Sequence, residues 1–390
     1  MRQLTLLVAL ILIGSAGLAD DADRIAKLES EVAELKQLVT SLQEKQVATS
    51  QQAPIRESEA RSTPSLRVGG FGHTQYEFSD PNRSGGSATN HFTVGGLDLF
   101  FASQISDRWS FLGETLFEFE PNGENVLDVE RLLIQFDYAE WLRISAGRGH
   151  LPLGFWNQRY HHGTFLQTTV DRPLVYRFED DGGLLPIHFV GVELAGDIEL
   201  PGSYLSYAVN VANGRGREAD HVQLIEDRND SKMWSLLFTL HPTAEEGVGL
   251  GANIVRDRIP SNAAAGRPFG VDETIVGAHA FFIRPNWEVI LEGFWIDHEG
   301  DSVAPDFNHW GGFAQLSYSF GRLRPYYRFD FTDIARGDTF FAGLSEDLDQ
   351  HTLGLRFDFN KFVASKFEYR RLRFDDEDAN EAAAQLSFAF

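Results

Sequence analysis

Arginine recurs at alternate positions in neighbouring stretches near the end of this 390-residue chain. Successive side chains of an extended strand point to opposite faces, so residues two apart share a face. The arginines predicted to line one wall are Arg322, Arg324, Arg328, Arg356 and Arg370, and those on two earlier strands are Arg131, Arg143 and Arg148. Guanidinium groups stay charged at any physiological pH, so such a wall beside water would favour anions. We predict that these residues set the selectivity of a pore.

Carboxylates that could face this wall lie in residues 149–187, the longest stretch without regular patterning. Its charged residues are Arg159, Arg172, Arg177, Glu179, Asp180 and Asp181. Arginines across a channel from carboxylates would produce a transverse field that orients dipolar solutes and tunes ion selectivity. A simpler interpretation stays open, in which pairs such as Arg328 and Asp330 neutralise each other in a solvated wall.

Other chemistry finds little support in the sequence. Histidines in or beside the same stretch, namely His150, His161, His162 and His188, could bind a divalent metal together with Asp180 and Asp181. No metal-binding spacing is present, so no metal ligand is assigned. The chain has no cysteine, nucleophile elbow, phosphate loop or dinucleotide fingerprint, so we assign no catalytic residue and expect no cofactor. The net charge of −23 argues against nucleic-acid binding.

The body of the chain alternates apolar and charged residues with a period of two. Phe329 and Phe331 alternate with Arg328 and Asp330, and about sixteen segments of some ten residues follow this pattern. A soluble sandwich also alternates, but the abundance of Phe (32, against two Met) favours an apolar face that meets lipid. No later window holds eighteen apolar residues, which excludes helical spans. The prediction is an all-β fold, a transmembrane antiparallel β-barrel of about sixteen strands.

Connections between these segments alternate between short and long, as in outer-membrane barrels with short periplasmic turns and long external loops. The terminal "AQLSFAF" would close the barrel against its first strand. By this count, 149–187 is the third external loop. Its aromatic residues, among them Phe155, Trp156 and Tyr160, favour a loop that folds into the barrel as a constriction. The alternative is a lid that packs on neighbouring external loops.

The first 64 residues differ from this body. Residues 1–19 have the features of a secretory signal peptide, 20–46 repeat in heptads, 47–64 read as a polar linker, and 65–390 form the barrel. The predicted a and d positions of a periplasmic coiled coil are Ile25, Leu28, Val32, Leu35, Val39 and Leu42. A single amphipathic helix on the protein's own barrel is the alternative.

This architecture resembles the trimeric porins of bacterial outer membranes, in particular the phosphate-selective porin family and coiled-coil-bearing porins for dicarboxylates or sugars. "ISAGRGHLPLGFWNQ" resembles the segment in which that family's fifth strand enters the inward loop. The resemblance implies a homotrimer, an arginine ladder that guides anions, and recognition of Phe390 by the barrel assembly machinery. Only six Lys are present, a departure from the phosphate-specific members.

We therefore expect a non-enzymatic porin in lipid of the bacterial outer membrane, with its coiled coil in the periplasm. Small hydrophilic, anionic solutes would diffuse through it passively. The alternatives are a structural anchor that tethers periplasmic partners through the coiled coil, and an outer-membrane hydrolase. Conduction in a planar bilayer separates the channel from the anchor.

Overall fold

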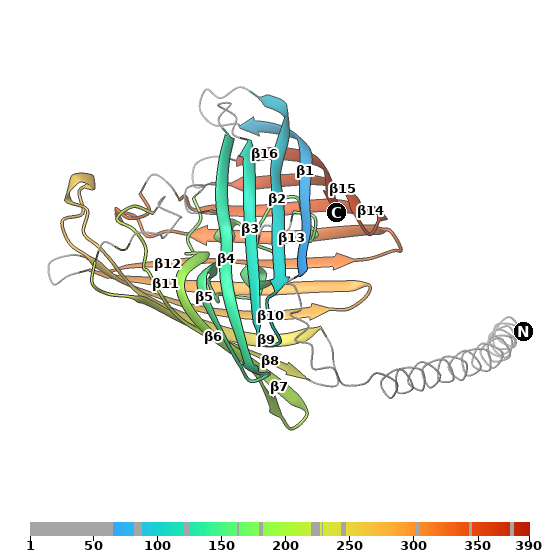
Figure 1. Cartoon of the computed structure of the whole chain (residues 1–390). Coiled ribbons are helices and arrows are strands. Elements are labelled where there is room, and N and C mark those ends of the chain that lie inside the picture. Colours follow the sequence, from blue (N-terminus) through green and yellow to red (C-terminus); the bar gives the residue numbers. More distant parts are fainter. Residues whose placement is uncertain are drawn as a thin grey trace, which may run out of the picture. The chain divides into compact units, whose positions relative to one another are not determined.

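Sixteen antiparallel strands form a closed barrel in the computed structural model (Figure 1), in which each strand pairs with the next and β1 pairs with β16. The structure describes residues 65–81, 88–119, 125–161, 164–178, 182–219, 227, 229–242, 247–300, 305–342, 345–374 and 378–390. The strands are β1 (Ser65–Pro81), β2 (Thr89–Gln104), β3 (Trp109–Phe119), β4 (Asn125–Ala139), β5 (Leu142–His150), β6 (His188–Leu200), β7 (Ser203–Ala212), β8 (Met233–Pro242), β9 (Val248–Ile259), β10 (Val271–Ile283), β11 (Trp287–Gly300), β12 (Phe307–Tyr318), β13 (Leu323–Asp333), β14 (Leu348–Asn360), β15 (Val363–Arg373) and β16 (Asp378–Ala389). The prediction of a sixteen-stranded barrel is confirmed.

The two faces of the wall differ as the alternation predicted. On β13, Arg328 and Asp330 are completely buried, whereas Tyr327 is 38% exposed. Large apolar side chains such as Leu250 and Phe367 are likewise exposed on other strands. In a barrel that spans a bilayer, such apolar residues contact hydrocarbon and the polar residues enclose the interior. Among the described residues, no helix is long and apolar enough to cross a membrane.

The ends of the sheet meet at two glycines. Gly70 and Phe390 exchange backbone hydrogen bonds of 3.1 and 2.9 Å, and Gly72 lies opposite Phe388. A Cβ atom at Gly70 would lie 2.5 Å from the carbonyl oxygen of Asp98 and 2.8 Å from the Phe390 ring. The missing side chains therefore let the terminal aromatic rings lie over the seam. The predicted closure of the last strand on the first is confirmed.

In the segment between β5 and β6, residues 151–187, the described residues form the one-turn helix α2 (Trp156–Arg159) and the 3₁₀ turn η1 (Leu174–Tyr176). A second 3₁₀ turn, η3 (Ala263–Ala265), lies between β9 and β10. We call residues 151–187 the inner loop, because its described residues pack against inward-facing side chains of the wall. Leu184 and Gly182 also accept hydrogen bonds from Arg215 and Ser345 of neighbouring connections. The largest buried apolar cluster joins Leu151 and Trp156 of this loop to Ile290 and Phe313 of the wall.

The predicted signal peptide, coiled coil and linker lie outside the described residues. The coiled-coil positions Ile25, Leu28, Val32, Leu35, Val39 and Leu42 are therefore still predictions from the sequence.

Candidate functional site: the constriction formed by the inner loop

Aromatic packing holds the middle of the inner loop against β11 and β12. Trp156 stacks on Tyr176 with ring centroids 5.3 Å apart, and Tyr176 meets the rings of Phe294 at 5.6 Å and Phe313 at 6.4 Å. Trp156 and Tyr176 are at most 1% exposed. Each such buried side chain stabilises the docked loop by roughly 1.5–3 kcal/mol. The middle of the loop therefore packs inside the barrel, as the constriction prediction requires, rather than as the external lid of the alternative interpretation.

Glu292 on β11 binds the loop where the loop first turns inward. Its carboxylate accepts hydrogen bonds from the backbone N–H groups of Phe155 (3.1 Å) and Trp156 (2.7 Å) and from the Tyr176 hydroxyl (2.7 Å). Burial and then the Glu292 carboxylate raise the pKa of Tyr176 far above its usual value, so the hydroxyl keeps its proton and donates it. Gly154 permits this approach with φ +61°, because a Cβ atom there would lie 1.9 Å from the Tyr176 oxygen.

Basic side chains of β13 to β15 bind the carbonyl groups of the same loop. Arg328 donates to the carbonyl oxygens of Asp171 (2.9 Å) and Arg172 (3.1 Å) and to the Thr169 hydroxyl (2.8 Å). Arg356 donates to the carbonyl oxygens of Phe165 and Gln167, both at 2.8 Å. Lys366 donates to those of Thr164 and Thr169.

Acidic side chains of the wall complement this pattern by accepting from loop amides. Asp330 accepts from Leu174 N–H at 3.1 Å, and Glu368 accepts from Val170 N–H at 2.8 Å. A buried segment without regular structure must find partners for its backbone polar groups. The inward-facing charges of the wall are those partners: cations bind loop carbonyls and carboxylates bind loop amides.

One ion pair connects the loop to β15 directly. Asp171 Oδ2 lies 2.7 Å from Arg370 Nη1. Burial alone would raise the pKa of Asp171, but Arg370, Arg177 and Arg328 outweigh it and hold the pKa below its ordinary value. Asp171 is therefore ionised at neutral pH, and the pair contributes an attraction between charges rather than a neutral contact.

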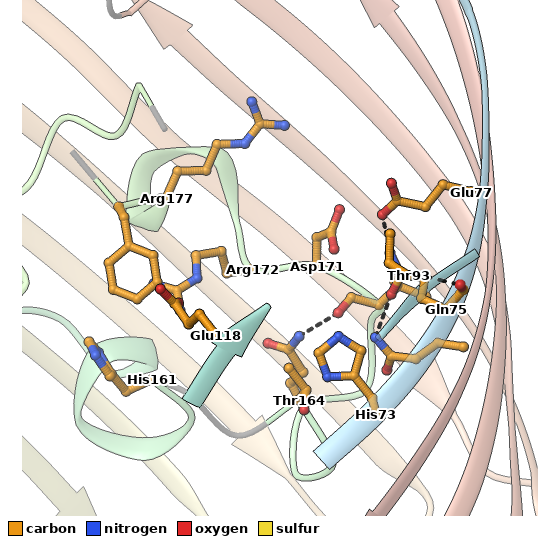
Figure 2. Close-up of a pocket in the computed structure, with 14 residues that line it drawn as sticks. His73, Gln75, Glu77, Thr93, Glu118, His161, Thr164, Asp171, Arg172 and Arg177 are labelled. Atoms are coloured by element: carbon orange, nitrogen blue, oxygen red, sulfur yellow. Dashed lines mark hydrogen bonds between the residues drawn. The ribbon is translucent and has the colours of Figure 1, made fainter. Parts of the chain in front are cut away.

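A cavity of about 450 Å³ lies between the inner loop and the wall formed by β1 to β3 and β16. Figure 2 shows Arg172 and Arg177 on the loop side and Glu77 on β1. The residues that line the cavity are His73, Gln75, Glu77, Thr93, Glu118, His161, Thr164, Gln167, Val170, Asp171, Arg172, Arg177, Phe178 and Gln385. The Arg172 guanidinium lies over the Phe178 ring, 3.8 Å from its centroid, and donates to the Tyr176 carbonyl oxygen at 3.2 Å. Its charge is therefore held in a fixed place at the cavity edge.

The remaining residues of the predicted selectivity wall do not gather at one place. Arg322 is exposed in the turn before β13, and Arg324 is half-buried with Nε 2.7 Å from Ser319 Oγ. Arg131 pairs with Glu114, Arg143 with Asp197 at 3.1 Å, and Arg148 is buried on β5. Of the predicted loop residues, Arg159 is exposed on α2, while Glu179, Asp180 and Asp181 lie outside the described residues.

Several residues of the site were not singled out from the sequence. Glu292, Glu368 and Lys366 occupy inward-facing strand positions that the alternation does identify, but nothing local says that a loop covers them. His73, Gln75 and Glu77 alternate on β1 in the same way. The sequence shows that these charged residues face inward. It does not show which residues of the loop they bind.

A closed barrel of sixteen antiparallel strands, narrowed by an inward loop, is the fold of outer-membrane porins, so the predicted resemblance is confirmed at the level of fold. The anion-selective porin from Comamonas acidovorans matches with a TM-score of 0.62 over 84% of this chain and 100% of its own, at 11% identity. The outer membrane channel DcaP of Acinetobacter baumannii matches with a TM-score of 0.56 over 85% and 99%, also at 11% identity. The trimer form of in-vitro folded OmpT of Vibrio cholerae matches with a TM-score of 0.53 over 84% and 100%, at 10% identity. No family model and no curated protein matches the sequence.

Proposed function

We propose that this protein is an outer-membrane channel through which small hydrophilic solutes, preferentially anions, diffuse passively. The observation that carries the proposal is the polar cavity of about 450 Å³ between the inner loop and the β1–β3 wall. A cavity of this size inside a barrel admits a small solute with part of its water, and its lining offers hydrogen bonds and both signs of charge.

Arg172 and Arg177 supply the proposed preference for anions. Both lie on the inner loop at the cavity, and Arg172 is fixed by its contact with the Phe178 ring. Glu77 on β1 lies on the other side of the cavity in Figure 2, so a solute between Glu77 and the two arginines experiences a transverse field. The strand residues Arg328, Arg356 and Arg370 affect selectivity indirectly, because they bind the inner loop and so position its arginines. The printed description of the Comamonas acidovorans porin as anion-selective agrees with this proposal.

Planar-bilayer recordings of the purified protein test the channel. Discrete conductance steps, in groups of three for a trimer, are the expected result. A folded barrel that gives no conductance would refute the channel and favour the structural anchor.

Replacement of the loop arginines tests the selectivity. One fixed charge about 6 Å from a passing ion in water contributes about 0.7 kcal/mol, or roughly a three-fold change in relative permeability. We expect Arg177→Ser to lower the anion-to-cation permeability ratio by about this factor, and Arg172→Ser with Arg177→Ser to lower it further, measured by reversal potentials in a KCl gradient. Arg371→Ser is the matched control, because Arg371 is exposed on β15 and pairs with Asp378 at 2.7 Å. Equal reversal potentials for the loop variants and the control would refute the assignment.

A further inference from the structure

Three histidines converge where the inner loop leaves the wall and returns to it. His150 is the last residue of β5, His188 is the first of β6, and the two lie opposite each other in the ladder. His161 follows α2 and is 3% exposed. Glu130 on β4, which is 2% exposed, completes the group. Residues far apart in sequence thus meet at one point of the wall.

The ligand atoms of this cluster are close enough to share one ion. His161 Nε2 lies 2.9 Å from His188 Nε2, and Glu130 Oε2 lies 2.7 Å from His188 Nε2 and 3.9 Å from His161 Nε2. The His150 ring stacks on the His161 ring with centroids 3.7 Å apart, and one nitrogen of each histidine lies within 4.8 Å of the others. Ligands about 2.0–2.1 Å from a tetrahedral zinc ion lie roughly 3.3 Å from one another. Changes of about 0.4–0.6 Å in the three distances among His161, His188 and Glu130, with a movement of His150 of up to about 1.5 Å, would therefore admit the ion.

The protonation of His161 favours metal binding. Asn157 Nδ2 donates to the carbonyl oxygens of Leu151 (3.0 Å) and Ile187 (2.9 Å), which identifies Asn157 Oδ1 as an acceptor. His161 Nδ1, 2.7 Å from that oxygen, must then donate. Neutral His161 consequently presents a lone pair on Nε2, toward His188. A ring N–H that donates to a carbonyl group is the arrangement that orients metal-bound histidines.

Nearby carboxylates and the adjoining cavity also favour a cation at the histidines. Glu114 on β3 is also buried, and its Oε2 lies 4.0 Å from His150 Nε2. Arg131 pairs with Glu114, but Glu130 adds a further carboxylate at the histidines. His161 also lines the cavity (Figure 2), so an ion could arrive from the pore.

A second cluster of similar composition lacks the same property. His309 Nδ1 accepts from Ala335 N–H at 3.1 Å, so its Nε2 carries the proton and donates to Asp338 at 2.9 Å. Both ring nitrogens of His298 face carboxylates, Asp338 at 2.6 Å and Glu273 at 2.9 Å. The hydrogen bonds of His298 and His309 therefore identify no histidine lone pair that is directed at the other ligands. This cluster provides a matched control.

We propose that Glu130, His150, His161 and His188 bind one divalent transition-metal ion of the zinc class. The ion replaces the proton between His161, His188 and Glu130, and connects β4, β5 and β6 to the loop segment after α2. Binding therefore releases a proton and clamps both ends of the constriction loop. The proposal is independent of which solutes the channel passes.

Metal titration of the full chain in detergent, after treatment with a chelator and desalting, tests the site. One Zn²⁺ per chain, and with Co²⁺ the visible absorption of a four-coordinate ion, are the expected results. His161→Gln and His188→Gln should each weaken Zn²⁺ binding. Loss of an outer-shell partner typically weakens it about 10–100-fold, so loss of a ligand should weaken it by at least as much. His309→Gln should leave both affinity and stoichiometry unchanged. The heat-dependent gel shift of each variant confirms that its barrel has folded.

X-ray absorption of the Zn²⁺-loaded wild type provides a measurement that needs no variant. Three imidazole nitrogens and one carboxylate oxygen are expected in the first coordination shell. Sub-stoichiometric binding, a shell with fewer imidazoles, or equal losses in His309→Gln and His161→Gln would each overturn the proposal.

Discussion

Single inward-facing charges decide where the inner loop meets the wall, and Glu292 makes three hydrogen bonds with the loop. It accepts two amide hydrogens and one hydroxyl hydrogen, all from residues that the barrel covers. The amides of Phe155 and Trp156 have left the strand ladder and would otherwise be buried without a partner. A carboxylate can satisfy all three donors, because its two oxygens offer about four acceptor sites.

We expect Glu292→Ala to destabilise the protein by about 1–3 kcal/mol for each of the two orphaned amides. Unfolding in guanidinium, followed by tryptophan fluorescence, measures this change in free energy. Glu140→Ala in the exposed turn after β4 is the control and should change the free energy of unfolding by less than about 0.5 kcal/mol. Equal stabilities of the two variants would mean that water replaces the Glu292 carboxylate.

The inner loop depends on tertiary contacts because its described residues contain little secondary structure of their own. A four-residue helix and a three-residue 3₁₀ turn cannot position a connection of this length. Its position comes instead from aromatic packing on β11 and β12 and from charged side chains of β13 to β15. The strand ladder does not take part in these contacts, so the loop can loosen while the barrel remains closed.

Arg328→Ser tests this separation of loop and barrel. The substitution removes three hydrogen bonds to the loop and leaves the buried Asp330 without its arginine, a change that typically costs about 3–5 kcal/mol. We expect a folded barrel with larger and noisier single-channel conductance. Arg324→Ser is the control, because half-buried Arg324 makes one 3.3 Å contact with the loop, at Thr168. Unchanged conductance of Arg328→Ser would show that the aromatic contacts alone hold the loop.

At the scale of the whole molecule, the sequence was sufficient to predict the barrel. It was not sufficient to predict which residues the side chains of the inner face bind. A period of two and the turn residues are local features, so the closed barrel and its approximate number of strands follow from them. The bonds of Arg356 to the loop join residues 189 and 191 positions apart, and no local pattern encodes such a contact. The alternation placed Arg328 and Arg356 on the inner face, but only the path of the loop shows that they bind backbone carbonyl groups. The histidines of the loop were visible in the sequence, whereas Glu130 joins them through strand register.

Oligomerisation is the remaining prediction at this scale. The heptads at residues 20–46 are short, so a helix there is marginal alone and would gain stability if contacts between barrels also held the chains together. We expect deletion of residues 20–46 to shift the population on native gels from trimer toward monomer, because three tethered helices raise the effective concentration of one another. Replacing Leu28, Leu35 and Leu42 with Ala should have the same effect, whereas Ser30→Ala with Gln37→Ala, outside the predicted a and d positions, should not. Trimers that persist after the deletion at the same protein concentration would mean that contacts between barrels are sufficient and that the predicted coiled coil is not needed for assembly.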